Sequence, residues 1–126
     1  MGKVTKLAVA DRSVVLTQAL AETAHRLDLG PTEVGRIVGV SQPTASRMLK
    51  GEYFLKESAK EWELSAHLVR LYRSLFSLVG SDDHLARGWL RSANKAFAGQ
   101  EPIAVIKRID GLIHVCEYLD AYRARI

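Results

Sequence analysis

Residues 32–50 read Thr32-Glu-Val-Gly-Arg-Ile-Val-Gly-Val-Ser-Gln-Pro-Thr-Ala-Ser-Arg-Met-Leu-Lys50, and this stretch predicts two short helices joined by a tight turn. Gly39 supplies the unusual backbone angles that such a turn needs. Ser41 is a favourable N-cap for the second helix, and Pro43 falls in its first turn, where a missing N–H costs nothing. The stretch therefore predicts a helix-turn-helix.

The second of these helices carries short polar side chains and long cations, which are the groups that reach base edges and phosphates from the major groove of DNA. The candidate DNA-binding residues are Ser41, Gln42, Thr44, Ser46, Arg47 and Lys50. The alternative is a plain helical hairpin with a polar outer face. We therefore predict a DNA-binding protein.

Charge along the chain supports this prediction. The net charge is +4, with nine Lys and Arg against six Asp and Glu in residues 1–60, and nine against eight in residues 61–126. The positive excess lies with the predicted helix-turn-helix, as contact with phosphates requires. Because the excess is modest, we expect one copy to bind DNA weakly and a dimer to be needed for useful affinity.

Length and composition indicate one compact domain, or two small ones that share a core, because the chain has 126 residues, 48% of them hydrophobic and 25% charged. No apolar run approaches the ~20 residues that cross a bilayer, and the first residues lack the apolar segment of a signal peptide. The single cysteine, Cys116, lies in an apolar helical pattern and is expected to be a buried thiol. These features favour a cytoplasmic protein.

Apolar residues recur at intervals of three and four, and alternating strand patterns are almost absent, so the sequence predicts an all-α fold. We divide the chain into a helix-turn-helix region, residues 1–60, and a small C-terminal helical region that continues it, residues 61–126. A first helix is expected over about residues 11–29, capped by Asp11 or Ser13. A long helix is expected from Ser58, which forms a capping-box pattern with Glu61.

The long helix carries leucines spaced four and three residues apart. They are Leu64, Leu68, Leu71 and Leu75. A second apolar flank includes Trp62 and Phe76. One interpretation of the leucine face is a homodimer seam, and the other is a core helix buried on most sides. The sequence leaves both interpretations open.

The C-terminal half contains a second informative segment. Residues 89–99 read Trp89-Leu-Arg-Ser-Ala-Asn-Lys-Ala-Phe-Ala-Gly99, followed by Pro102 and a last amphipathic helix. This segment resembles the C-terminal toxin-binding domain of the Xre/MbcA/ParS antitoxins, and residues 32–50 resemble the helix-turn-helix of Xre-type repressors. The two resemblances occur in the order that this family shows.

The chain departs from the family pattern at a few positions. In the helix-turn-helix, Gly35 stands where Ala is usual, and Ala45 where Val or Ile is usual. In the C-terminal turn, Ala93 stands in place of the usual Pro, and Phe97-Ala98-Gly99 in place of Leu-Gly-Gly. The two small residues reduce the core between the helices, so we expect that pair to be loosely packed.

The resemblance implies an antitoxin that binds a RES-domain toxin, an enzyme that degrades NAD⁺, and inhibits it at its active-site cleft. It also implies that the antitoxin represses its own operon through operator DNA, as a homodimer and in a higher-order toxin–antitoxin complex, in the bacterial cytoplasm. No cofactor, metal or membrane is implied. The alternative is a stand-alone dimeric helix-turn-helix repressor with no toxin partner.

Two groups of residues are candidates for toxin contact. They are Trp89, Arg91, Ser92, Asn94 and Lys95 in the turn segment, and Tyr122, Arg123, Arg125 and Ile126 at the C-terminal tip. The residue types of the first group favour a structural task, because Trp89 can pin the turn to the last helices and Asn94 can bond local backbone. The tip is either a frayed helix end or a charged segment that enters the toxin's cleft.

Catalytic patterns are weak in this chain. The histidines are scattered over different predicted helices, and neither a nucleophile–base pair nor a Gly-rich phosphate loop accompanies them. We therefore predict a protein that is not an enzyme.

Overall fold

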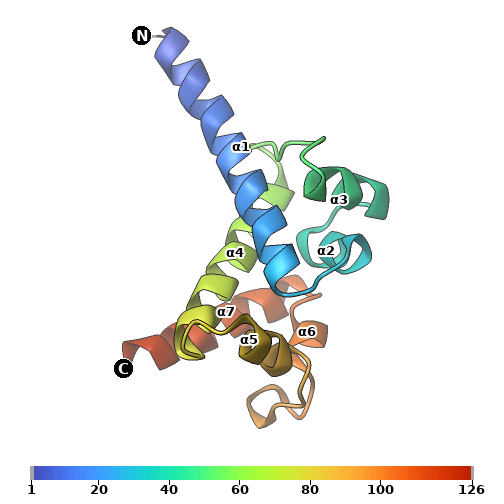
Figure 1. Ribbon diagram of the computed structural model, residues 1–126, viewed down its shortest axis with the longest axis vertical. Coiled ribbons are helices and arrows are strands. Elements are labelled where there is room, and N and C mark those ends of the chain that lie inside the picture. The colour runs from blue at the N-terminus through green and yellow to red at the C-terminus, as the bar shows by residue number, and fades with distance from the viewer. Residues whose placement is uncertain (1, 126) are drawn as a thin grey trace.

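The chain folds into helices, and residues 2–125 contain no strand. The computed structural model describes the backbone of residues 2–125 and the side chains of residues 12–125. The helices are α1 (Gly2–Arg26), α2 (Pro31–Val38), α3 (Gln42–Leu49), α4 (Lys60–Leu78), α5 (Asp83–Leu90), the short 3-10 helix η1 (Lys95–Phe97), α6 (Pro102–Val105) and α7 (Ile109–Ala124). The all-α prediction is confirmed (Figure 1).

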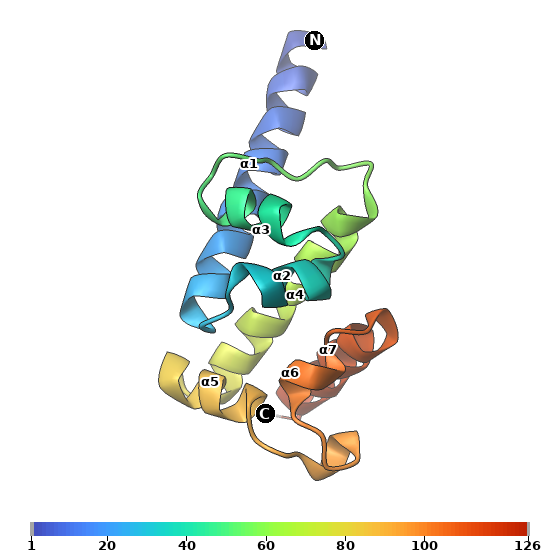
Figure 2. The same cartoon turned by 90° about the vertical axis from the view of Figure 1, so that its right-hand side faces the viewer.

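Helix α4 runs through the middle of the molecule and joins its two halves (Figures 1 and 2). It contacts α1 and α2 of the helix-turn-helix region, and α5 and α7 of the C-terminal region. Buried side chains from both regions, such as Leu20, Val34, Leu68 and Leu112, belong to one hydrophobic cluster. The two regions therefore share a core, while the boundary at residue 60 stays a prediction.

The leucine face of α4 lies inside the single chain. The exposed fractions of Leu64, Leu68, Leu71 and Leu75 are 5%, 0%, 0% and 1%. A seam between two chains needs apolar side chains that one chain leaves exposed, and these four are already covered by their own chain. The interpretation of these leucines as a dimerisation seam is therefore corrected: they are core residues. Dimerisation through another surface stays a prediction.

Helix α1 starts earlier and ends earlier than the sequence predicted. It begins at Gly2 and its first turns extend away from the body, so neither Asp11 nor Ser13 is its N-cap (Figure 1). It ends at Arg26, because Asp28 adopts a left-handed conformation with φ 57°. This turn directs Leu29, which is 5% exposed, back into the core.

Helix α4 begins without the predicted capping box. Its N-cap is Ala59, one residue beyond Ser58, and no side chain caps it. The Glu61 carboxylate instead accepts a hydrogen bond from the Tyr53 hydroxyl at 3.2 Å. The segment before α4 is anchored to the core by Leu55, which is 0% exposed.

Helices α2 and α3 approach each other closely, which corrects the expected loose packing. A Cβ added to Gly35 would lie 2.7 Å from the carbonyl oxygen of Val40. Ala45 on the facing helix is 0% exposed. The small residues at these two positions therefore let the helices come together, and a larger side chain at Gly35 would push the turn outward.

Candidate DNA-binding and partner-binding surfaces

The turn between α2 and α3 has the geometry that the sequence predicted. Gly39 is left-handed, with φ 81°, and its N–H donates to the carbonyl of Gly35 at 2.9 Å. The Ser41 hydroxyl accepts a hydrogen bond from the Thr44 N–H at 3.3 Å, so Ser41 is the N-cap of α3. Both predictions are confirmed, and the turn fixes the direction of α3.

Helix α3 buries one face and presents the other. Ala45 and Met48, at 0% and 1% exposed, anchor it to the core. The other face carries the candidate DNA-binding residues, of which Ser41, Gln42, Arg47 and Lys50 are exposed and Thr44 and Ser46 are half-buried. A short helix with a buried anchor and an exposed polar face can enter the major groove of DNA.

Thr44 organises the polar side chains on this face. Its hydroxyl oxygen accepts hydrogen bonds from the Ser41 hydroxyl at 3.0 Å and from Arg47 Nη2 at 3.3 Å. The guanidinium of Arg47 is thereby held along α3, and its other N–H groups remain able to donate to a base edge or phosphate. The arrangement supports the predicted role of Arg47, which stays a prediction.

The C-terminal turn is held by its own side chains. The Asn94 side-chain oxygen accepts a hydrogen bond from the Ala96 N–H at 2.9 Å, and the Ser92 hydroxyl donates to the carbonyl of Gly88 at 2.6 Å. The rings of Trp89 and Phe97 meet edge to face, with centroids 6.1 Å apart. The predicted structural task of this segment is therefore confirmed for Trp89 and Asn94, while Lys95 is exposed.

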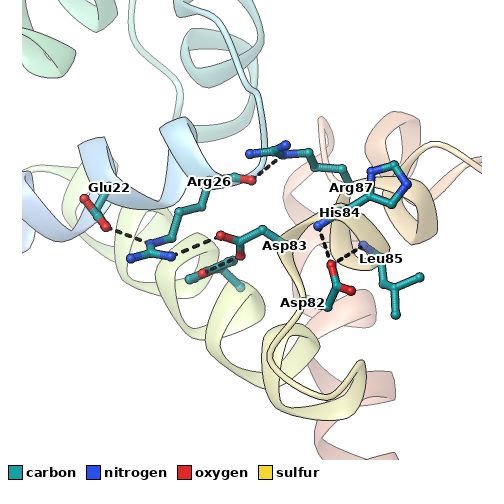
Figure 3. Close-up of polar contacts among 8 residues, drawn as sticks. Glu22, Arg26, Asp82, Asp83, His84, Leu85 and Arg87 are labelled. Carbon is teal, nitrogen blue, oxygen red and sulfur yellow. Dashed lines mark hydrogen bonds and ion pairs between the residues drawn. The ribbon is translucent and has the colours of Figure 1, made fainter.

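A polar contact joins the end of α1 to the start of α5, and sequence reasoning did not find it (Figure 3). Arg26 Nη1 lies 3.0 Å from Asp83 Oδ2, and the Tyr72 hydroxyl donates to Asp83 Oδ1 at 2.8 Å. Hydrogen bonds to the carboxylates of Glu22 and Asp83 raise the pKa of Arg26 above its usual value. Asp82 caps α5, because its carboxylate accepts hydrogen bonds from the N–H groups of His84 and Leu85.

Arg91, a candidate toxin contact, lies in a second contact between the two regions. Its Nη2 is 3.0 Å from Glu33 Oε1 of α2 and donates to the carbonyl of Asp28 at 3.1 Å. Its side chain is 41% exposed, so it holds α5 against α2 at the surface. Glu33 and Arg91 are 58 residues apart, and no local pattern indicates the pair.

The C-terminal tip continues the last helix, since α7 extends to Ala124. Arg123 Nη1 donates to the Ser74 hydroxyl of α4 at 3.2 Å. The guanidinium of Arg125 lies 5.7 Å from the centroid of the Tyr122 ring. Both cations therefore have partners in the chain, and Ile126, the last candidate toxin contact, lies outside the described residues.

The described residues offer little further candidate chemistry. Cys116 is 4% exposed and its thiol donates to the carbonyl of His67 at 3.4 Å; burial raises its pKa to about 11, so it is the buried thiol that the sequence predicted. The described residues contain no group of three potential metal ligands. Among them, no helix combines the length and apolar character needed to cross a membrane.

Two known protein families together match nearly the whole chain. Residues 6–70 match the antitoxin Xre-like helix-turn-helix domain, and residues 74–125 match the antitoxin Xre/MbcA/ParS C-terminal toxin-binding domain. A search of curated proteins found no match. The two domains occur in the order that the sequence resemblance indicated, and both families consist of non-enzymatic regulators. The chain therefore belongs to the Xre-like antitoxins, which join a DNA-binding helix-turn-helix domain to a toxin-binding domain.

Proposed function

We propose that this antitoxin neutralises a RES-domain, NAD⁺-degrading toxin by covering its active site, and that it represses its own operon as a homodimer in the bacterial cytoplasm. The observation that carries the proposal is the shared core of the two matched domains: α4 packs against α1 and α2 and also against α7. The exposed face of α3 and the C-terminal domain can therefore hold operator DNA and a toxin on the same molecule. The higher-order toxin–antitoxin complex follows from these two contacts.

The DNA-binding part is tested by substitutions on α3. Gln42→Ala and Arg47→Ala are each expected to weaken binding to the chain's own promoter by about 1–3 kcal/mol, because each removes a potential contact with a base edge. Lys50 is a candidate phosphate contact, so Lys50→Ala should lower affinity for all DNA sequences. It should also reduce the slope of the logarithm of the binding constant against the logarithm of salt concentration by about one. Titrations at several salt concentrations measure both effects.

A matched control for these titrations is Arg108→Ala. Arg108 is exposed between α6 and α7, outside the helix-turn-helix. Its loss should leave promoter affinity within about twofold of that of the unaltered protein, since a distant rim charge contributes little. Unchanged affinity of a Gln42→Ala, Arg47→Ala double variant would remove α3 from the DNA interface.

The neutralising part is tested by removing residues 123–126. The last buried side chain of α7 is Leu119, so the truncated protein should fold and bind DNA as before. Growth rescue during toxin co-expression should fail, because the cationic tip is proposed to block the cleft while the helices supply most of the contact area. The assay is run beside a pull-down and an NAD⁺ measurement. Full rescue by the truncated protein would shift inhibition to the helical surface around residues 89–99.

The second candidate function is a stand-alone dimeric repressor. It shares the DNA contact and differs by the lack of a toxin, so the genes beside this one distinguish the two. A reading frame adjacent to the gene, whose product co-purifies with the chain on co-expression, supports the antitoxin. The matched toxin-binding domain, residues 74–125, favours the antitoxin.

A further inference from the structure

An open apolar groove lies between the end of α4, helix α5 and helix α7, with a volume of about 330 Å³. Its floor is formed by Leu75 and Leu119, which are 1% and 2% exposed. Its walls and rim are formed by Leu78, Trp89, Tyr118 and Tyr122. We call these residues the aromatic groove. None of the described residues that line it is charged.

The rings of Trp89 and Tyr118 in the aromatic groove are held in place by contacts with each other and with Phe97. Trp89 and Tyr118 stack, with centroids 6.5 Å apart and planes at 21°. Phe97 packs edge-on against both, at 6.1 Å from Trp89 and 5.1 Å from Tyr118. Side chains that are already fixed lose little conformational entropy when a partner covers them. Aromatic side chains that are fixed in a pocket in this way are often the residues that contribute most of the binding energy at a protein–protein interface.

The charge at the rim indicates the chemistry of the occupant. Tyr122 is 45% exposed, and the Arg125 guanidinium lies over its ring. An apolar side chain of a partner would therefore fill the groove, and a neighbouring carboxylate of the same partner segment would meet Arg125. The Arg91 guanidinium, by contrast, is engaged with Glu33 within the chain.

The position of the groove in the chain indicates which partner binds there. All of its lining residues fall within residues 74–125, the segment that matches the toxin-binding domain. The larger groove between α1 and α4, rimmed by Arg12 and Arg73, lies outside that segment. We infer that the toxin docks on the aromatic groove, through an apolar side chain with an acidic neighbour. This inference rests on the proposed function, because it specifies where the toxin of that proposal binds.

The first test compares two groove variants with a matched surface variant. Leu78→Glu places a charge on the groove wall, and Tyr122→Ala removes the exposed rim without touching the core. Leu85→Glu is the control, because Leu85 is a 53% exposed leucine of α5 that does not line the groove. The probe is the purified product of the reading frame adjacent to this gene, and calorimetry measures its Kd. Each groove variant should raise Kd at least tenfold, with the control within about twofold.

The second test observes the groove directly. Trp62→Phe leaves Trp89 as the only tryptophan of the chain, which has two. Labelling this variant with 5-fluorotryptophan, and mixing it with unlabelled toxin, reports on Trp89 alone. The fluorine resonance should shift on binding, and its sensitivity to exchange of H₂O for D₂O should fall, because the toxin covers the ring. Tyr122→Ala should reduce this change at the same toxin concentration.

The outcomes of these tests distinguish a failure of this inference from a failure of the proposed function. Failure of the unaltered chain to bind the toxin would overturn the proposed function and the groove with it. Binding by the unaltered chain, with Leu78→Glu and Tyr122→Ala unchanged, would overturn the groove alone. An equal loss in Leu85→Glu, or an unshifted fluorine resonance in the complex, would also overturn it. Circular dichroism tests whether each variant is folded. If Leu78→Glu is unfolded, the result for Tyr122→Ala decides the test.

Discussion

A Leu71→Glu variant is expected to be unfolded at room temperature. Leu71 is 0% exposed near the centre of α4 and belongs to the hydrophobic core cluster. A carboxylate at this position would lose its hydration without gaining a partner, and the leucine packing would be lost too. The combined cost exceeds about 4 kcal/mol, which approaches the whole free energy of unfolding of a domain at the lower end of the usual range of about 5–15 kcal/mol.

Circular dichroism and sedimentation measure the outcome, and Ala66→Glu is the control. Ala66 is exposed on the same helix, so the same new charge there should leave the protein folded. A folded Leu71→Glu monomer with weakened operator binding would restore the dimer-seam interpretation of the leucines. A folded Leu71→Glu protein of unchanged assembly would contradict both interpretations.

Gly111→Ala is expected to disrupt the C-terminal domain. A Cβ at this position would lie 2.0 Å from the carbonyl oxygen of Val105 and 2.9 Å from its carbonyl carbon. Because these are backbone atoms, no rotation of a side chain relieves the contact, and α6 and α7 have to separate. We expect a loss of about 3 kcal/mol in the free energy of unfolding, together with weaker toxin binding.

The matched control is Gly88→Ala in α5. A Cβ added there meets no atom within 4 Å, so the better helix propensity of alanine should stabilise the protein by about 0.5–1 kcal/mol. Urea unfolding of the two variants measures the difference, which should approach 4 kcal/mol. Similar unfolding midpoints would show that α6 and α7 are not in close contact.

Sequence reasoning succeeded where a feature depends on residues close together in the chain. Gly39, Ser41 and Asn94 all act on backbone within a few residues, by allowing a turn or by accepting a hydrogen bond from a nearby N–H. Such contacts depend on residue type and spacing, which the sequence displays directly. The helix-turn-helix and the C-terminal turn can therefore be predicted from the sequence alone.

Local patterns left a feature undecided, or misled, where two different environments produce the same sequence pattern. An apolar stripe on α4 is the same pattern whether a second chain or α1, α2 and α7 cover it, and only the packed structure showed the leucines inside one chain. The small residue Gly35 suggested a loose interface, yet the carbonyl of Val40 occupies the space that a side chain would need.

Tertiary structure alone decided the features that join distant parts of the chain. The Arg26–Asp83 and Glu33–Arg91 contacts connect residues 57 and 58 positions apart, and the aromatic groove combines the end of α4 with α5 and α7. The sequence by itself determined the all-helical fold and the two turns, because periodicity and capping are local properties. Which faces meet, and which remain open for a partner, depends on how the helices pack around α4, and no local pattern records that packing.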